Sequence, residues 1–155
     1  MKLTRGGEYG IRGVLYLSQQ EEGKVSMLSA IAKTQDVPPR FLAKIFQALA
    51  KAGVVKSHRG AKGGFSLAKP AGEITIKDVI EAVEGPIQLN ICLAAPGECN
   101  RDTLCPIHTV WEEAQEKMMM VLNGKNFAEL AREEKQLLLT IAPQGSTPSE
   151  NGGSH

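Results

Sequence analysis

The sequence predicts a mainly α-helical fold with a small β wing: a winged helix-turn-helix unit followed by one long helix. Three observations predict it. Apolar residues recur at helical spacing in most segments, the turn DVPP at 36–39 separates two short helical segments, and a turn rich in glycine and basic residues at 58–64 lies between two short strand candidates. At 155 residues, the chain is long enough to bury a core and short enough for a single domain.

The first 70 residues contain three predicted helices and a hairpin. The helices cover 8–20, 26–35 and 39–52, and the strands cover 54–55 and 65–67. Ser26 or Ser29 is the expected cap of the second helix, because serine side chains accept hydrogen bonds from free backbone N–H groups. Pro39 opens the third helix, where proline is tolerated, and Gly53 ends it. We therefore assign residues 1–70 to the winged helix-turn-helix.

Residues 71–135 continue the same domain with a helix, a loop and two further helices. Thr75 is expected to cap a helix over 75–83, whereas residues 86–105 show no clear period. From Pro106 onward, apolar residues at helical spacing predict a helix of about 17 residues with a strong apolar seam.

The C-terminal end and the composition bound the class of protein. A short helix is expected over 126–139, and residues 136–155 are expected to be a largely disordered tail, because the last residues carry too little apolar area to order themselves. No apolar run approaches the ~20 residues that cross a bilayer, and the N-terminus MKLTRGGEYG lacks the apolar core of a secretion signal. We therefore expect a cytoplasmic protein with no membrane partner.

Basic residues are concentrated in one part of the chain. Residues 33–63 hold seven basic side chains against one acidic side chain, a net charge of +6, whereas the whole chain carries +1 and the remainder therefore −5. A local excess of this size is typical of a polyanion-binding site. A solvated basic face has the same composition, so charge alone leaves both interpretations open.

On the winged-helix layout, the basic segment becomes a candidate DNA-binding site. The major groove of B-DNA admits one helix, which the preceding helix braces against the backbone. Arginine can read guanine, glutamine can read adenine, and glycines in the hairpin tip allow close approach to the minor groove or phosphates. The candidate DNA-binding residues are Ser29, Pro39, Arg40, Ala43, Lys44 and Gln47 in the helices and His58, Arg59, Gly60 and Lys62 in the hairpin.

All three cysteines lie in the loop CLAAPGECNRDTLCPIH, residues 92–108. Cys92, Cys99, Cys105 and His108 form a complete four-ligand set for zinc or for an iron–sulfur cluster. Structural zinc sites usually contain a close pair of cysteines, which this loop lacks, so the wider spacing favours a bulkier cluster. His108 lies one helical turn from Cys105, so both side chains can point the same way. Free thiols and a zinc site remain alternatives.

At these stretches the sequence resembles the bacterial winged-helix iron–sulfur regulators of the Rrf2 family, typified by IscR and NsrR. The resemblance covers about residues 1–135 and rests on MKLTRGGEYGIRGVLYL, on DVPPRFLAKIFQALAKAGVVKSHRGAKGGFSLAKP, and on the three-cysteine loop with CPIHTVW. It implies a homodimer held by the long helix, which is then a dimerisation helix, on palindromic double-stranded promoter DNA. It also implies a cluster that senses iron–sulfur status, nitric oxide or redox state.

The resemblance also implies a set of cluster ligands. Cys92, Cys99 and Cys105 match the cysteines that hold the cluster, and His108 matches the histidine that completes a [2Fe–2S] site in IscR-like members. NsrR-like members use an acidic residue at the place of Glu8 to hold a [4Fe–4S] cluster, so Glu8 is the alternative fourth ligand. We favour His108 and [2Fe–2S], because the C-x-x-H spacing matches and the Glu8 match is inexact.

Three positions bear on how far the resemblance extends. The gap between Cys92 and Cys99 is six residues, one longer than is usual in the family. Ala43 stands where IscR-like proteins have glutamate, so their target sequence cannot be transferred. Arg59 matches the wing arginine that enters the minor groove.

The resulting hypothesis is a dimeric transcriptional regulator, not an enzyme, whose DNA affinity is controlled by an iron–sulfur cluster and which takes no small-molecule substrate. In this hypothesis the cluster ties residues 92–105 to the long helix. It thereby sets the distance between two recognition helices, which must be about 34–36 Å for half-sites one DNA turn apart.

Three alternatives remain. One is a winged-helix regulator with a zinc site or a cysteine thiol switch in place of the cluster. A redox enzyme or electron carrier is a different class, but the chain has no nucleotide-binding glycine motif and no Ser/His/Asp arrangement. A protein–protein adaptor that uses the long helix leaves the basic hairpin unexplained.

Overall fold

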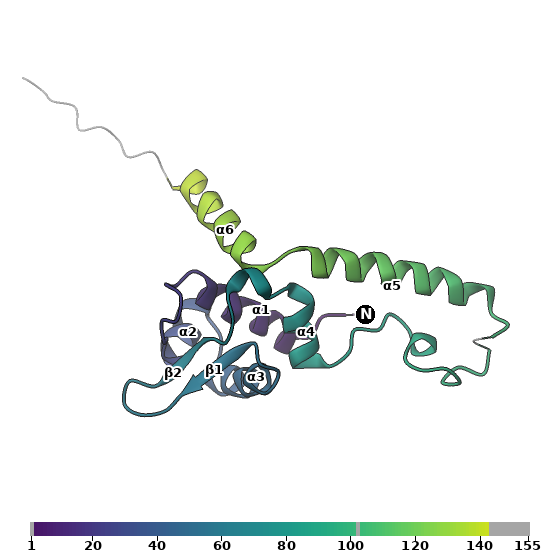
Figure 1. The fold of residues 1–155 in the computed structure, drawn as a ribbon, viewed down its shortest axis with the longest axis horizontal. Coiled ribbons are helices and arrows are strands. Elements are labelled where there is room, and N and C mark those ends of the chain that lie inside the picture. The colour runs from purple at the N-terminus through teal and green to yellow at the C-terminus, as the bar shows by residue number, and fades with distance from the viewer. Residues whose placement is uncertain (1, 102, 143–155) are drawn as a thin grey trace, which may run out of the picture.

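The computed structural model describes residues 2–101 and 103–142, and its first part is a winged helix-turn-helix body (Figure 1). The body contains α1 (Arg5–Ser18), α2 (Leu28–Gln35), α3 (Pro39–Lys51), β1 (Val55–His58), β2 (Gly64–Leu67), the 3-10 turn η1 (Ala71–Glu73) and α4 (Ile76–Glu84). The two strands form an antiparallel hairpin in which Val55 pairs with Leu67 and His58 pairs with Gly64. The predicted mainly helical fold with a small β wing is confirmed.

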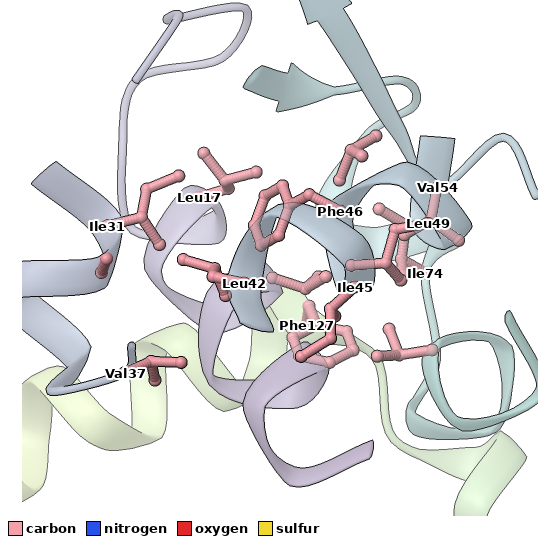
Figure 2. Packing of buried hydrophobic residues seen from close by; sticks show 14 residues of the cluster. Leu17, Ile31, Val37, Leu42, Ile45, Phe46, Leu49, Val54, Ile74 and Phe127 are labelled. Atoms are coloured by element: carbon pink, nitrogen blue, oxygen red, sulfur yellow. The ribbon is translucent and has the colours of Figure 1, made fainter. Parts of the chain in front are cut away.

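The core lies where the buried faces of α1, α2 and α3 meet (Figure 2). Leu42, Phe46 and Leu49 of α3 are fully buried at the predicted i, i+4, i+7 spacing. The Phe46 ring meets Phe65 of the wing edge-to-face, with 4.9 Å between ring centroids. Gly13 of α1 lies directly under Phe46, and a Cβ there would stand only 2.5 Å from the Phe46 ring. The position therefore has no room for a side chain.

The start of α2 differs from the prediction. Met27, not a serine, is the N-cap residue of α2, and no side chain caps the helix. Ser26 is buried and pairs through its backbone with Phe65, with N–O distances of 2.9 and 2.8 Å, so it forms an isolated antiparallel bridge beside the wing. Gly64 makes room for this pairing, because a Cβ there would lie 2.1 Å from the Ser26 carbonyl oxygen. Ser29 is exposed in the first turn of α2.

α4 closes the body against α1. Its predicted cap, Thr75, forms a full capping box with Asp78, so each side chain bonds the other residue's backbone N–H. At the other end of α4, the Glu84 carboxylate accepts hydrogen bonds from the Thr4 backbone N–H, at 2.8 Å, and from the Thr4 hydroxyl. Since Thr4 also caps α1, the start of α1 is fixed to the end of α4.

The rest of the chain, called the arm below, extends from the body in two directions: the loop and the helix after it run one way, and the last helix, which contacts α1, runs the other way (Figure 1). It consists of a loop that contains the 3-10 turn η2 (Ile91–Leu93), then α5 (Pro106–Gly124) and α6 (Phe127–Ile141). α5 has no buried residue, so its predicted apolar seam is uncovered in a single chain. α6 extends to Ile141, so the boundary expected at residue 136 falls inside a helix; the rest of the expected tail, 143–155, lies outside the described residues.

The junction between α5 and α6 ties the arm to the body, in addition to the contacts of α5 with α4 and of α6 with α1. Thr75 and Asn126 form an isolated antiparallel bridge, and the Phe127 N–H donates to the Ile74 carbonyl at 2.9 Å. Asn126 is also the N-cap of α6, in a second capping box. The side chain of Phe127 is fully buried in the core. The junction is therefore held by backbone pairing and by apolar burial together.

An ion pair crosses the same junction. Lys125, which ends α5, hydrogen-bonds and pairs with the Glu133 carboxylate of α6. This hydrogen bond and the charge of Glu133 raise the pKa of Lys125 above its ordinary value. Within the described ranges, no helix is long and apolar enough to cross a bilayer.

Candidate DNA interface and cysteine loop

The turn between α2 and α3 presents α3 as a recognition helix. Asp36 adopts the left-handed conformation, with φ of 52°, and ends α2. Two prolines follow, and Pro39 occupies the first turn of α3. The left-handed residue and the prolines produce a sharp turn between the two helices. α3 then buries its apolar face against α1. The opposite face of α3 is exposed to solvent.

The exposed face of α3 carries the side chains that the sequence predicted. Arg40, Lys44 and Gln47 are exposed, and Ala43 is half-buried beside them. Among the described residues, neither Arg40 nor Lys44 forms an ion pair, because the four pairs present use other residues. Cationic side chains without an internal partner are available for phosphate or guanine. Pro39 is exposed at the start of this face.

The wing presents a second basic surface. Its tip is tight, with the Gly63 N–H donating to the Gly60 carbonyl at 2.9 Å, and Gly60 has a positive φ of 102° that favours glycine. Arg59 and Lys62 are exposed and form none of the ion pairs found in the described part of the chain. The hairpin therefore holds two free cations at the tip of a narrow loop.

His58 has a structural contact inside the wing. Its Nε2 lies 2.8 Å from the Ser66 hydroxyl, and Ser66 is only 4% exposed. The imidazole is half-buried, so one ring nitrogen is already used to join the two strands. This contact places the next residue, Arg59, at the start of the tip.

The cysteine loop brings some of the predicted ligands together. An open hollow of about 330 Å³ is lined by Cys92 of η2, by Thr103, and by His108 and Glu112 of α5. His108 Nδ1 is buried and has no hydrogen-bond partner among the described residues. Buried polar atoms are normally paired, so this nitrogen is free for a ligand.

The full ligand set does not converge. All three cysteines are free thiols and partly accessible, but Cys99 and Cys105 do not line the hollow. Over residues 2–101 and 103–142, no three His, Cys, Asp or Glu side chains are grouped closely enough to bind a metal ion. Free thiols together with an unpaired imidazole nitrogen are nevertheless donor types that suit an iron–sulfur cluster. Cys105 is the N-cap of α5 and thus stands at the base of the helix that carries His108.

Glu8 lies apart from this hollow. It is in the first turn of α1, where its carboxylate pairs with Arg12 at 2.6 Å, and it does not line the hollow around His108. Within a single chain, His108 is therefore the candidate fourth ligand that lies close to a cysteine.

Two residues near the loop were missed in the sequence. Glu112 lines the hollow one helical turn after His108, a spacing that would have placed both on one face. Gln115 of α5 accepts a hydrogen bond from the Leu89 N–H at 3.0 Å and so holds the start of the loop against the helix. No sequence signal marks this second contact, because a glutamine on a helix surface has no fixed partner.

A winged helix-turn-helix with unpaired cations on its recognition helix and wing defines a class of protein, the DNA-binding transcriptional regulators. The profile of the Rrf2 family, described as iron-dependent transcriptional regulators, matches residues 3–133. The chain belongs to this family, and it is therefore a transcriptional regulator rather than an enzyme.

Individual relatives agree with this assignment. The chain is 34% identical over 136 residues to an HTH-type transcriptional regulator of Aquifex aeolicus, which covers 86% of this chain and 94% of that protein. It is 33% identical over 148 residues to the transcriptional regulator IscR of Serratia proteamaculans, covering 95% of this chain and 89% of that protein.

Solved structures share the fold. T. potens IscR superposes with a TM-score of 0.71 at 25% identity, covering 95% of this chain and 93% of that one. The global cysteine regulator CymR of B. subtilis superposes with a TM-score of 0.73 at 28% identity, covering 86% of this chain and 98% of that one. The structural neighbours thus include both an IscR and a cysteine regulator.

Proposed function

We propose that this chain is a dimeric, cytoplasmic regulator whose affinity for double-stranded promoter DNA is controlled by an iron–sulfur cluster. The observation that carries the proposal is the free, buried Nδ1 of His108, which lines the same hollow as Cys92 at the start of α5. The residues proposed to hold the cluster are Cys92, Cys99, Cys105 and His108. The similarity to IscR proteins supports this set.

The proposed dimer uses α5. This helix of 19 residues buries none of its side chains in the single chain, and Ile107, Val110 and Val121 on its seam are more than half exposed. Exposed apolar surface of this extent is typical of an interface. A symmetric pairing of α5 with a second copy would place two recognition helices on one palindromic site.

The control mechanism follows from what α5 connects. When bound, an iron–sulfur cluster would supply a one-electron redox couple. The residues that would hold it belong to the loop and to the start of α5: Cys92, Cys99, Cys105 and His108. Gln115 holds the start of the loop on α5, and Thr75 with Asn126 holds the far end of α5 on the body. When no cluster holds the loop, the connection from the loop through α5 to the body becomes less ordered. The spacing between the winged-helix bodies of the two copies then changes. The expected coupling free energy is about 1–3 kcal/mol.

The direct test is anaerobic purification of the full chain, followed by iron, zinc and sulfide analysis and electron paramagnetic resonance. Two irons and two sulfides per chain, with a signal after one-electron reduction, support a [2Fe–2S] site completed by His108. Four irons and four sulfides per chain would indicate Glu8 as the fourth ligand instead. In the dimer, this Glu8 could belong to the same copy as the cysteines or to the other copy. Zinc alone, or no metal after reconstitution, contradicts cluster control.

The cysteine variants test coupling to DNA. Cys92→Ala, Cys99→Ala and Cys105→Ala should each abolish visible absorption and change the affinity for an operator selected from random DNA by the wild-type protein. Ser57→Ala, a substitution at an exposed position of β1, is the matched control and should leave the visible absorption unchanged. Unchanged operator affinity in all three cysteine variants would contradict the coupling, while DNA binding itself would stand.

A thiol switch is the second candidate, and one observation favours it. All three thiols are free and partly accessible, and they do not converge in the single chain. The similarity to B. subtilis CymR and to the oxidised form of Staphylococcus aureus CymR is compatible with it. A regulator of this kind would change its operator affinity on treatment with peroxide while containing no iron or sulfide.

A further inference from the structure

The first turn of α3 exposes a large aromatic side chain. Phe41 is 62% exposed, although its neighbour Leu42 is fully buried and Ile45, one turn later, is buried too. Its backbone N–H donates to the Pro38 carbonyl at 3.1 Å, so the residue is held within the helix. Of the described aromatic rings, only Phe46 and Phe65 contact each other. Phe41 therefore has no aromatic partner within the described residues, and most of its surface is open to solvent.

The place of Phe41 separates it from the other exposed apolar side chains. Most of them lie on the arm, and a second copy would cover those on the α5 seam in the proposed dimer: Ile107, Val110 and Val121. Among the described residues, only Met27 and Phe41 of the large exposed apolar side chains belong to the body. Of these two, only Phe41 is on the recognition helix, where it follows the exposed Arg40 in the sequence and precedes the exposed Lys44.

The chemistry of the major groove gives an apolar ring at this position a partner. The N-terminal residues of a recognition helix are the ones that contact base edges. Every base edge in the major groove presents hydrogen-bonding groups, and thymine alone adds an apolar one, its C5-methyl. A phenylalanine ring cannot hydrogen-bond to a base, but it can shield this methyl group from water.

We propose that Phe41 is a specificity-determining residue that contacts the C5-methyl group of one thymine in each DNA half-site. The proposal rests on the proposed DNA-binding function. Arg40 and Lys44 hold the first turn of α3 close to the phosphates and bases, and Phe41 selects thymine at the position that its ring reaches. It also gives Ala43 a clear role: with a small side chain at this position, the turn can approach the bases closely.

The test removes the methyl group from the DNA and the ring from the protein. The full-length protein first selects a duplex from a random-sequence library. Each thymine of the half-site is then replaced in turn by deoxyuridine, which lacks only the C5-methyl. At one position, deoxyuridine should weaken binding of the wild-type protein about fourfold, the factor that corresponds to ~0.8 kcal/mol for one buried methyl group.

Phe41→Ala should bind the thymine and deoxyuridine duplexes equally at that position. Arg40→Ala is the matched control, because it removes the neighbouring side chain and should weaken binding to both duplexes while keeping the fourfold ratio. Since Phe41 is exposed, the variant should keep the wild-type melting temperature, which checks that the fold is intact.

Two results would overturn the proposal. In one, no thymine of the selected site distinguishes thymine from deoxyuridine with the wild-type protein. In the other, Phe41→Ala keeps the fourfold ratio, which would assign the methyl contact to a different residue. A wild-type chain that selects no sequence at all would instead contradict DNA binding, so the two failures are distinguishable.

Discussion

Arg59 and Lys62 lie on the same wing tip, yet we expect them to contribute to DNA binding in different ways. An arginine in a narrow minor groove is attracted by the enhanced negative potential of A/T-rich DNA. Arg59→Ala should therefore weaken binding about tenfold on sites with an A/T-rich flank and less on G/C-rich flanks. Fluorescence anisotropy on paired duplexes measures the difference.

Lys62→Ala is the matched control for Arg59→Ala. A lysine that contacts only phosphate should lower affinity equally on both flanks and reduce the slope of log affinity against log salt by about 1. If Arg59→Ala weakens binding equally on every flank, Arg59 is a phosphate contact as well.

Substitutions of His58 and His108 should separate cluster binding from wing structure. His108→Ala removes the imidazole that lines the hollow beside Cys92, so we expect less iron and sulfide per chain and weaker visible absorption. His58→Ala removes the contact with Ser66 and should leave iron content unchanged while lowering DNA affinity. Equal iron content in both variants would exclude His108 as a ligand.

At the scale of elements, α1 depends on two glycines that differ in their surroundings. Gly13→Ala should destabilise the fold by about 1–3 kcal/mol, because the new methyl group would overlap the Phe46 ring. Gly6→Ala is the control: its Cβ would meet its neighbours at 3.4 Å, and alanine favours a helix by up to ~1 kcal/mol. Urea unfolding measures both, and equal stability of the two variants would contradict the packing argument.

The capping box of α4 should be worth a measurable amount. Thr75→Ala removes the side chain that accepts from the Asp78 N–H at 3.2 Å, so we expect a loss of about 1 kcal/mol in the free energy of unfolding. Thr34→Ala removes a hydroxyl that bonds only the Ala30 carbonyl within α2 and should change stability by less than about 0.5 kcal/mol. A smaller loss for Thr75→Ala than for Thr34→Ala would show that the cap is not stabilising.

The elements that sequence could predict are those with local determinants. The spacing of apolar residues and the flanking proline, threonine and glycine located α3, α4 and α5 to within a few residues, because each signal lies inside the element. α1 begins at Arg5, three residues before the prediction, since Gly6 and Gly7 disfavour a helix and only packing against α4 and capping by Thr4 compensate. Ser26 was wrong as a cap because its partner, Phe65, is 39 residues away.

The candidate site was predictable in its residue types but not in its arrangement. Exposure of Arg40, Lys44 and Gln47 follows from the buried stripe on the opposite face of α3. The loop around Cys99 has no period, so nothing in the sequence determines which thiols converge. The contact of His58 with Ser66 could not be predicted, because it depends on the register of the hairpin.

At the scale of the whole molecule, α5 should determine the oligomeric state. Val121→Glu places a charge on the exposed apolar seam, so we expect a monomer by light scattering and weaker binding to a palindromic operator. Thr109→Glu adds the same charge to the opposite face of α5 and should remain a dimer. If both variants stay dimeric, the interface lies elsewhere.

The junction at Thr75 and Asn126 also has a geometric consequence. Since α5 contains 19 residues, it is about 28 Å long at ~1.5 Å per residue. A pivot of about 10° at the junction would therefore move the far end of such a helix by about 5 Å, more than the ~3.4 Å rise along the DNA axis from one phosphate of a strand to the next. In a symmetric pair, the displacements of the two copies add. A small rotation near the helix caps Thr75 and Asn126 can therefore shift one winged-helix body out of register with its DNA half-site.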